Sequence, residues 1–561
     1  MKNLINYFII STILSFAFAF EIPDAIGYNG VVVCSKKEAA QIGIDILKKG
    51  GNAIDASVGV AFALAVTHPS AGNIGGGGFA MIRLANGDVT SFDFRETAPS
   101  LAYENMFLDS LNNVIPGKSK YTSWAAGVPG SVHGLGTIHE KFGSLPWDVL
   151  VYPSVNLARF GFELDLHNII ILNSERYKKL LANDIVSKKI FTKDVDYKIG
   201  DLLIQKDLSL TLERIAKYGY KEFYEGKTSD YIIECMNRTG GLISRNDLRN
   251  YKSVEREPIT FSYRGYTIHS MPPPSSGGIT LASILNQLEN VDFSEFNFHS
   301  KLHLHYLVES ERRSYADRAE FLGDTDFINV PIDSLISKEY AKKRFFTISP
   351  DKASNSSDIG FGEISINESE ETTHFSIVDK FGNSVSLTTT INGWYGSGIS
   401  VDNAGFILNN EMDDFSSKPG FPNMYGLIGN KANSIQPGKR MLSSMTPTIV
   451  EDLNNDLFLV LGSPGGSTII TTVAQIIVNI IDFNMSIQES IEAKRFHHQW
   501  LPDIIQIERN SIANEVIDDL ISMGHSFKYR SSIGESNCIM VKGEFILGSS
   551  DSRRGAIAIG Y

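Results

Sequence analysis

Cysteine is scarce in this chain and widely scattered. Cys34, Cys235 and Cys538 are the three cysteines among 561 residues, and no two of them form a CxxC pair. This spacing provides neither a zinc motif nor a disulfide framework. We expect three buried thiols, with a single bridge as the alternative.

Positive charge is also in deficit. The chain has 51 lysines and arginines against 64 aspartates and glutamates, which gives a formal net charge of -13. No basic stripe compensates for this excess, so the composition argues against a nucleic-acid-binding protein. Internal repeats of roughly 20 to 50 residues are absent as well, which disfavours solenoids and propellers. The hydrophobic content of 42% indicates a well-cored globular protein instead.

Long hydrophobic runs are missing except at the N-terminus. Residues 4–20 are mostly apolar, and a small-x-small sequence typical of a signal-peptidase site ends at Ala19. We interpret residues 1–19 as a signal peptide cleaved after Ala19, which predicts a periplasmic or secreted protein. An uncleaved membrane anchor is the alternative. Residues 53–67 are also apolar but too short to span a bilayer, so we expect no stable membrane span.

A threonine-rich hairpin stands out in the second half of the chain. Residues 372–379 alternate between polar and apolar side chains, turn-forming residues follow, and residues 384–391 form a second β-like run. If the hairpin is centred on Phe381, equal offsets place Thr372 opposite Thr390, within hydroxyl contact. On pattern alone, an ordinary structural hairpin explains these residues equally well.

Two glycine-rich stretches have different predicted uses. Residues 72–79 contain four consecutive glycines without the lysine of a phosphate loop, and we interpret them as a site of tight packing. Residues 462–467 precede a helical pattern over 468–481. Backbone N–H groups at such a helix start favour negative charge, which is the arrangement that an oxyanion hole requires.

Arg95 lies at the end of a predicted strand, next to a loop marked by proline. Its planar guanidinium could hold a carboxylate in two parallel hydrogen bonds. An ion pair with the neighbouring Asp93 or Glu96 is the alternative.

A cluster of carboxylates and a pair of hydroxyls follow the hairpin. Glu411, Asp413 and Asp414 lie within four positions but lack the spacing of an EF-hand, so holding a substrate ammonium group is an alternative to binding calcium. Ser443 and Ser444 are adjacent hydroxyls, for which a local turn is the simplest interpretation.

Between these clusters, residues 416–439 form a long connection of the kind that often serves as a lid, with Tyr425 in its middle. His497 and His498 are adjacent, so their side chains diverge on a regular element. We interpret them as structural histidines rather than metal ligands.

Several of these motifs occur in the order seen in gamma-glutamyltranspeptidases, and the resemblance covers essentially the whole mature chain. The segments that carry it are Phe94-Arg95-Glu96, Gly127-Val128-Pro129-Gly130, Thr372-Thr373-His374-Phe375-Ser376, Asn409-Asn410-Glu411-Met412-Asp413-Asp414-Phe415, Ser443-Ser444-Met445-Thr446-Pro447-Thr448, Gly462-Ser463-Pro464-Gly465-Gly466 and Arg495-Phe496-His497-His498-Gln499-Trp500. The chain departs from the family pattern at Ser552, where a proline is common, and at the bulky Trp394 and Tyr395.

The resemblance implies an α+β fold, the four-layer αββα sandwich of the N-terminal nucleophile hydrolases. It also implies that one precursor cuts itself between Glu371 and Thr372 into a large chain, residues 20–371, and a small chain, residues 372–561. Cleavage frees an α-amine on Thr372 with a pKa of roughly 8, so one residue supplies both the nucleophilic hydroxyl and its base.

The resemblance further implies a role for each site residue in attack on the γ-amide of a glutamyl substrate. These roles are nucleophile (Thr372), hydrogen-bond partner of its hydroxyl (Thr390), α-carboxylate binding (Arg95, Ser443, Ser444), α-ammonium binding (Asn392, Glu411, Asp414), lid (Tyr425) and oxyanion binding (Gly465, Gly466).

The expected activity is that of a γ-glutamyltransferase and glutathione hydrolase. Its substrates are glutathione and other γ-glutamyl compounds, its acceptors are water, amino acids or peptides, and no metal or organic cofactor is needed. Two alternatives remain at this point: a secreted relative without catalysis that binds a ligand or partner, and a glutaryl-type acylase of the same superfamily.

Overall fold

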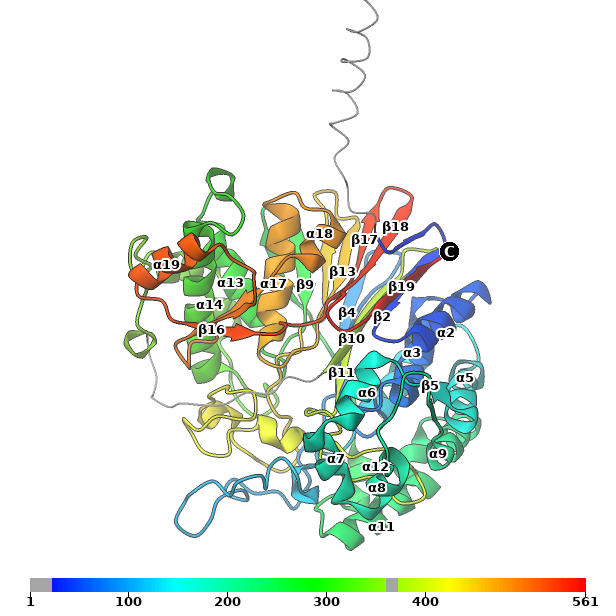
Figure 1. The fold of residues 1–561 in the computed structure, drawn as a ribbon. Helices are drawn as coiled ribbons and strands as arrows, with labels where there is room; N and C mark the ends of the chain where they lie inside the picture. Colours follow the sequence, from blue (N-terminus) through cyan, green and yellow to red (C-terminus); the bar gives the residue numbers. More distant parts are fainter. Residues whose placement is uncertain (1–22, 360–371) are drawn as a thin grey trace, which may run out of the picture.

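Two stacked β-sheets form the centre of the molecule, and helices cover both outer faces (Figure 1). The computed structural model describes residues 23–359 and 372–561. The expected signal peptide and Glu371, one side of the expected cleavage site, lie outside the described residues. The sequence of layers is helix, sheet, sheet, helix, so the expected four-layer αββα sandwich is confirmed.

The first sheet has seven strands and contains the threonine-rich hairpin. In spatial order its strands are β19 (Ile557–Gly560), β2 (Gly30–Cys34), β10 (Thr373–Asp379), β11 (Ser384–Thr390), β3 (Gly77–Arg83), β4 (Val89–Asp93) and β7 (Val254–Arg256). All the pairings between these neighbours are antiparallel.

The second sheet also has seven strands and draws on both halves of the chain. In spatial order they are β1 (Ala25–Gly27), β18 (Phe545–Ser550), β17 (Asn537–Lys542), β13 (Leu457–Leu461), β12 (Thr448–Glu451), β9 (Tyr266–Ser270) and β8 (Ile259–Tyr263). A smaller sheet joins β14 (Phe496–His497), β15 (Ile505–Glu508) and β16 (Phe527–Arg530), and β5 (Phe162–Glu163) pairs with β6 (Leu202–Leu203).

The helices divide between the two outer faces. Those on the side of the first sheet are α2 (Lys37–Lys48), α3 (Ala53–Thr67), α4 (Ser131–Phe142), α5 (Trp147–Phe160), α6 (Leu166–Asn173), α7 (Glu175–Ala182), α8 (Ile185–Phe191), α9 (Lys206–Tyr218), α10 (Lys221–Glu225), α11 (Lys227–Thr239) and α12 (Arg245–Asn250). Those on the side of the second sheet are α13 (Gly277–Leu288), α14 (Lys301–Phe321), α15 (Ile332–Leu335), α16 (Lys338–Phe345), α17 (Thr468–Ile481), α18 (Ile487–Glu492) and α19 (Asn514–Ser522).

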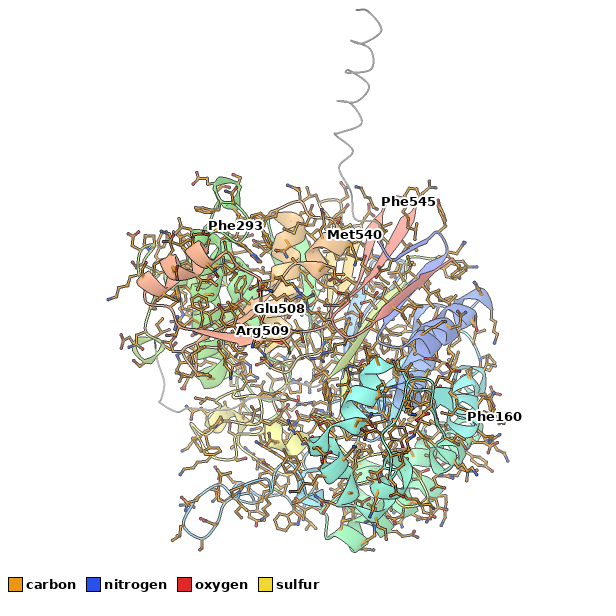
Figure 2. All side chains as sticks on the ribbon, in the orientation of Figure 1. Phe160, Phe293, Glu508, Arg509, Met540 and Phe545 are labelled. Carbon is orange, nitrogen blue, oxygen red and sulfur yellow. The ribbon has the colours of Figure 1, made fainter. Side chains whose placement is uncertain are left out.

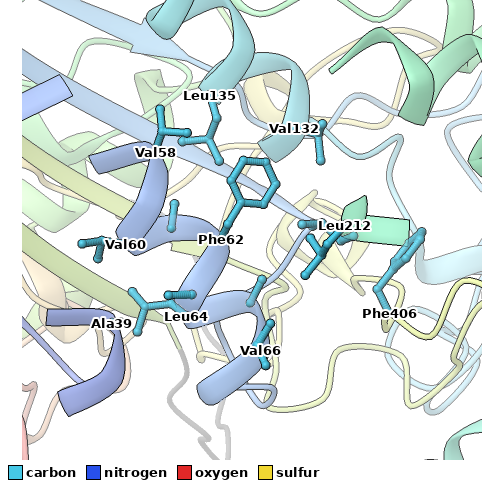
Figure 3. Close-up of a cluster of buried hydrophobic side chains, with 14 of the residues drawn as sticks. Ala39, Val58, Val60, Phe62, Leu64, Val66, Val132, Leu135, Leu212 and Phe406 are labelled. Carbon is cyan, nitrogen blue, oxygen red and sulfur yellow. The ribbon is translucent and has the colours of Figure 1, made fainter. Parts of the chain in front are cut away.

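Helix α3 shows why the sequence folds into layers. Asn52 and Asp55 form a capping box at its start, and every residue of the helix is buried. Figure 3 shows Phe62 of this helix among Val58, Val132 and Leu135. A helix that is apolar on all sides is stable only between two packed layers, and α3 lies between the first sheet and the helices outside it.

The space between the two sheets is filled by apolar side chains from both. Val31 and Phe79 of the first sheet meet Ile449, Val460 and Ile539 of the second. Figure 2 shows side chains filling the layers, whereas Phe160 and Phe545 lie at the periphery. The three cysteines are buried and free, as expected. Among the described residues, no helix combines the length and hydrophobicity that a membrane crossing requires.

The threonine-rich hairpin has the expected register. Thr373 pairs with Thr389 and Val378 with Ser384, so the offsets are equal on either side of Phe381. Continuing this register by one residue places Thr372 across from Thr390. The even-numbered side chains of β10 face the second sheet, where Ser376 donates a hydrogen bond to the Asn537 carbonyl oxygen (2.8 Å). The side chain of Thr372 therefore emerges between the two sheets.

Candidate active site

A small pocket opens where β10 begins and β11 ends. Residues from widely separated segments line it, and they include ten of the predicted site residues. The lining residues are Arg95, Arg318, Thr372, Thr390, Asn392, Glu411, Asp414, Tyr425, Leu427, Leu442, Ser443, Ser444, Met445, Gly466 and Ile469.

Thr372 and Thr390 are the two hydroxyls at the base of the hairpin. Both are almost fully buried and line the same pocket. The backbone N–H of Asn392 donates to Thr390 Oγ1 (2.7 Å). Because a hydroxyl has one hydrogen of its own, Thr390 can still donate to a neighbouring oxygen. A hydroxyl that accepts one hydrogen bond and keeps its own hydrogen to donate suits a residue that orients the hydroxyl of Thr372.

The four-glycine run holds β11 from the other side. A Cβ atom at Gly76 would lie 2.0 Å from the carbonyl oxygen of Thr390, so no larger residue fits there. Asn73 fixes the contact, because its Nδ2 donates to that carbonyl oxygen (2.8 Å) and its Oδ1 accepts from the Gly76 N–H (2.7 Å). The predicted tight packing is confirmed, and its effect is to position Thr390.

The second glycine stretch turns immediately before α17. Gly465 and Gly466 have φ angles of 134° and 54°, which favour glycine. Within the described part of the chain, neither backbone N–H has a hydrogen-bond acceptor. A Cβ atom at Gly466 would lie 2.4 Å from the ring of Tyr425. Two free N–H groups at a helix start, beside the nucleophile candidate, have the composition of an oxyanion hole.

The acidic side of the pocket is organised by Arg95. Its guanidinium donates to Glu411 and to Asp414 Oδ2 (2.6 Å), and the nearest oxygen of Glu96 lies 3.7 Å away. Asp93 instead pairs with Arg256 (2.8 Å). Of the two local alternatives, the ion pair with Asp93 is therefore wrong and the ion pair with Glu96 is present, but Arg95 is also shared with two carboxylates distant in sequence.

One guanidinium does not neutralise three buried carboxylates. Burial raises the pKa of Glu96 to about 8, although Arg95 opposes the shift. Burial likewise raises the pKa of Asp414 to about 6, against the same opposing charge. Both oxygens of Glu96 and one oxygen of Glu411 have no hydrogen-bond partner among the described residues. The site can therefore accept a further cation, such as a substrate ammonium group.

Asp413 does not belong to this group. It accepts hydrogen bonds from Ser119 Oγ (2.5 Å) and from the backbone N–H of Met424 (2.8 Å), whereas Glu411 and Asp414 bind Arg95. The three neighbouring carboxylates thus serve different partners, which argues against the calcium interpretation.

Ser443 and Ser444 lie in the pocket, and Arg318 reaches the same place from α14. No sequence pattern predicted Arg318 as a site residue, because it lies inside a long helical pattern without a motif around it. Its Nη2 donates to Ser444 Oγ (3.2 Å) and its Nε to Ser276 Oγ (2.8 Å).

Tyr425 and Asn392 close the pocket. The hydroxyl of Tyr425 donates to the carbonyl oxygen of Asn392 (3.0 Å), and Asn423 Nδ2 donates to Asp414 Oδ1 (2.9 Å). Asn392 has a φ of 67° and its side chain donates to the Asn410 carbonyl oxygen (3.0 Å). The connection over residues 416–439 therefore contacts the pocket at two points, as expected of a lid.

His497 and His498 are buried and directed to different partners. His497 contacts Thr471 Oγ1 (2.8 Å), and His498 contacts Asp503 (3.2 Å). The interpretation as structural histidines is confirmed.

Within the described residues, the group with metal-ligand spacing is His305, Glu309 and His525. We assign no metal to it. The two imidazoles hydrogen-bond to each other (2.9 Å), and Arg312 and Arg313 already neutralise Glu309.

Comparisons with known proteins agree with this geometry. The model of the family described as Gamma-glutamyltranspeptidase matches residues 39–561. A glutathione hydrolase proenzyme of Escherichia coli (strain K12) is 46% identical over 529 residues, which cover 94% of this chain and 90% of that protein. Another, from Pseudomonas sp. (strain A14), is 43% identical over 548 residues, covering 95% of this chain and 94% of the relative.

Solved structures give the same result. A gamma-glutamyltranspeptidase of Helicobacter pylori is 46% identical with a TM-score of 0.57, covering 58% of this chain and 93% of that one. A cephalosporin acylase from Bacillus halodurans has a TM-score of 0.81 over 97% of this chain and 98% of its own, at 23% identity. The second likeness shows the fold alone.

Proposed function

This chain belongs to the gamma-glutamyltranspeptidase family, and from that premise we propose that it is a self-cleaving γ-glutamyltransferase and glutathione hydrolase with Thr372 as nucleophile. The observation that carries the proposal is the meeting of Thr372, Thr390 and Gly466 at one pocket, beside paired carboxylates and hydroxyls. Gly465, the neighbour of Gly466 in the chain, supplies the second free N–H group.

Self-cleavage is the first reaction. The hydroxyl of Thr372 attacks the carbonyl carbon of Glu371, and the amide becomes an ester through an N-to-O shift. Water then hydrolyses the ester and releases the Glu371 carboxylate and the Thr372 α-amine. The products are a large chain, residues 20–371 after loss of the signal peptide, and a small chain, residues 372–561.

Substrate cleavage uses the new amine as its base. The α-amine takes the hydroxyl proton of Thr372 while the hydroxyl oxygen attacks the γ-carbonyl carbon of glutathione or another γ-glutamyl compound. Gly465 and Gly466 stabilise the oxyanion, and collapse expels the leaving amine, which receives the proton. A γ-glutamyl ester on Thr372 remains, and water or the amine of an amino acid or peptide resolves it.

Recognition of the glutamyl head group uses both charges in the pocket. Glu411 and Asp414, together with Asn392, bind the α-ammonium group, and Arg95, Ser443 and Ser444 bind the α-carboxylate. Arg95 already pairs with Glu411 and Asp414, so the zwitterion inserts into an existing ion pair. A glutaryl group lacks the ammonium and would leave the paired carboxylates without a new cation, which favours the glutamyl substrate over a glutaryl one.

Localisation follows from the N-terminus. We propose that residues 1–19 direct export and are removed after Ala19, so that the mature enzyme acts in the periplasm or outside the cell.

Denaturing electrophoresis and a chromogenic amide test the proposal together. The mature enzyme should give fragments of roughly 38 and 21 kDa, from chain length at ordinary residue mass. It should also release p-nitroaniline from L-γ-glutamyl-p-nitroanilide. One uncut band with no release would instead support a relative without catalysis.

A further inference from the structure

Arg318 differs from the other cation of the pocket. Its side chain is 5% exposed and extends from α14 into the pocket. No carboxylate in the described part of the chain forms an ion pair with it, and its partners are the hydroxyls of Ser276 and Ser444. Burial lowers its pKa only to about 10, so the guanidinium is charged at neutral pH. A buried cation with hydroxyl partners alone has room for an anion.

The hydrogen-bond directions around Arg318 are fixed by its chemistry. A guanidinium donates and never accepts, so Ser444 Oγ is the acceptor and its own hydrogen is free. Ser443 Oγ accepts from the N–H of Met445 (3.1 Å), which leaves its hydrogen free as well. Neither hydroxyl donates to an acceptor among the described residues. The pocket therefore presents two O–H donors side by side.

Arg318 also braces the backbone that carries these hydroxyls. Its Nε donates to Ser276 Oγ, so the hydrogen of that hydroxyl points to the carbonyl oxygen of Ser443 (2.6 Å). The N–H of Ser276 reaches the same carbonyl (2.8 Å), and the N–H of Ser443 donates to the Pro274 carbonyl oxygen (2.9 Å). The turn before α13 and the Ser443 segment are thus joined by two backbone hydrogen bonds and by the Ser276 hydroxyl, which Arg318 orients.

Arg318 also contributes to the charge balance of the pocket. Arg95 and Arg318 are the cations that line the pocket, and Glu411 and Asp414 are the anions. A bound zwitterion adds one charge of each sign, so it leaves the net charge of the pocket unchanged. Without Arg318, the filled pocket would hold an uncompensated buried carboxylate.

We propose that Arg318 is a positioning residue for α-carboxylate recognition: it turns the hydroxyl proton of Ser444 toward the substrate, and through Ser276 it holds the backbone that carries Ser443. This inference rests on the proposed function, because it specifies how the same site selects an α-amino acid head group.

A pair of amides that differ only in the carboxylate tests the inference. L-γ-Glutamyl-p-nitroanilide carries the α-carboxylate, and 4-aminobutyryl-p-nitroanilide lacks it. Arg318→Met should lower the ratio of the two kcat/KM values by roughly 10- to 100-fold, mainly through KM for the γ-glutamyl amide. Ser276→Ala keeps the charge and breaks the brace, and should lower the ratio by about 3- to 10-fold. Inhibition constants of L-glutamate and 4-aminobutyrate provide the same ratio independently of turnover.

Arg313→Met is the matched control, because it makes the same change on the same buried helix away from the pocket lining. Its ratio should equal that of the wild type. A ratio that also stays unchanged in Arg318→Met and Ser276→Ala, or equal losses for both ligands, would overturn the inference. An inactive, uncut wild type would refute the proposed function itself.

Discussion

Two largely buried groups of arginines and carboxylates show how differently this protein uses the same chemistry. The pocket cluster consists of Arg95, Glu96, Glu411 and Asp414, and the α14 cluster consists of Glu309, Arg312, Arg313 and Asp503. The first has one cation for three anions, whereas the second has two of each. Charge is therefore matched in one cluster and unmatched in the other.

The carboxylate pKa values of the two clusters are shifted in opposite directions. Burial raises the pKa of Glu96 to about 8. At Glu309, burial is outweighed by Arg312, Arg313 and a hydrogen bond from Ser354, which lower the pKa to about 2. An imbalance that raises a buried carboxylate's pKa is the pattern of a binding or catalytic site, and a balanced cluster is the pattern of a structural one.

The most severe test removes the nucleophile and leaves both clusters intact. Thr372→Ala should remain one uncut chain and lose at least about 10³-fold in amide hydrolysis, because the hydroxyl that starts both reactions is gone. Gel electrophoresis measures the self-cleavage, and release of p-nitroaniline measures the amide hydrolysis. Thr372→Ser retains a hydroxyl and is the matched control, which should still cut itself. Substantial cutting of Thr372→Ala would reveal another nucleophile.

The next test compares the clusters directly. Arg95→Met leaves three carboxylates without their cation and should lower kcat/KM for the γ-glutamyl amide by about 10²- to 10³-fold. Arg313→Met removes one of two cations at the α14 cluster and should lower the free energy of unfolding by about 3 kcal/mol, with kcat/KM nearly unchanged. Similar kinetic losses in both variants would remove the distinction between a functional and a structural cluster.

The two clusters should also respond to pH in opposite directions. Glu96 has a raised pKa, so the folded state holds a proton that the unfolded state has lost, and stability falls as pH rises from about 4.5 to about 8. Glu309 has a lowered pKa, so its stabilisation is present above about 4.5 and is lost as pH falls toward about 2.

Urea unfolding of the uncut Thr372→Ala chain as a function of pH measures these slopes. Adding Glu96→Gln should make the free energy of unfolding fall less steeply as pH rises. Adding Glu309→Gln should make it fall less steeply as pH drops into the acid range. Identical pH profiles for the two double variants would show that the clusters do not differ in proton affinity.

Local sequence patterns predicted much of this structure. The hairpin register followed from alternation and turn residues around Phe381, and the buried position of α3 followed from its lack of a polar face. The packing of the four-glycine run followed from residue size. In each case the information lies within a few neighbouring residues, where backbone geometry dictates which side chains share a face.

Contacts between segments that are distant in the chain could not be predicted from the sequence alone. Arg95 and Glu411 are 316 positions apart, and the link from Arg318 to Ser444 spans 126. Family resemblance placed Arg95, Glu411 and Asp414 in the site, yet nothing in the sequence showed that they pair with one another. Ser276 lies in a proline-rich turn and Arg318 in a helix-forming pattern, both typical of structural segments, so their hydroxyl and guanidinium contacts required the assembled layers.

The smallest expected effect concerns the cover over the pocket cluster. Tyr425 donates one hydrogen bond to the Asn392 carbonyl oxygen, and Asn423 on the same connection donates to Asp414. Tyr425→Phe keeps the ring against Gly466 and removes a neutral hydrogen bond of about 1 kcal/mol, so KM for the γ-glutamyl amide should rise about fivefold. Tyr529→Phe on β16 is the exposed control and should match the wild type. An unchanged KM in Tyr425→Phe would mean that the Tyr425 hydroxyl does not help to hold the cover, because the hydroxyl is the only group that the substitution removes.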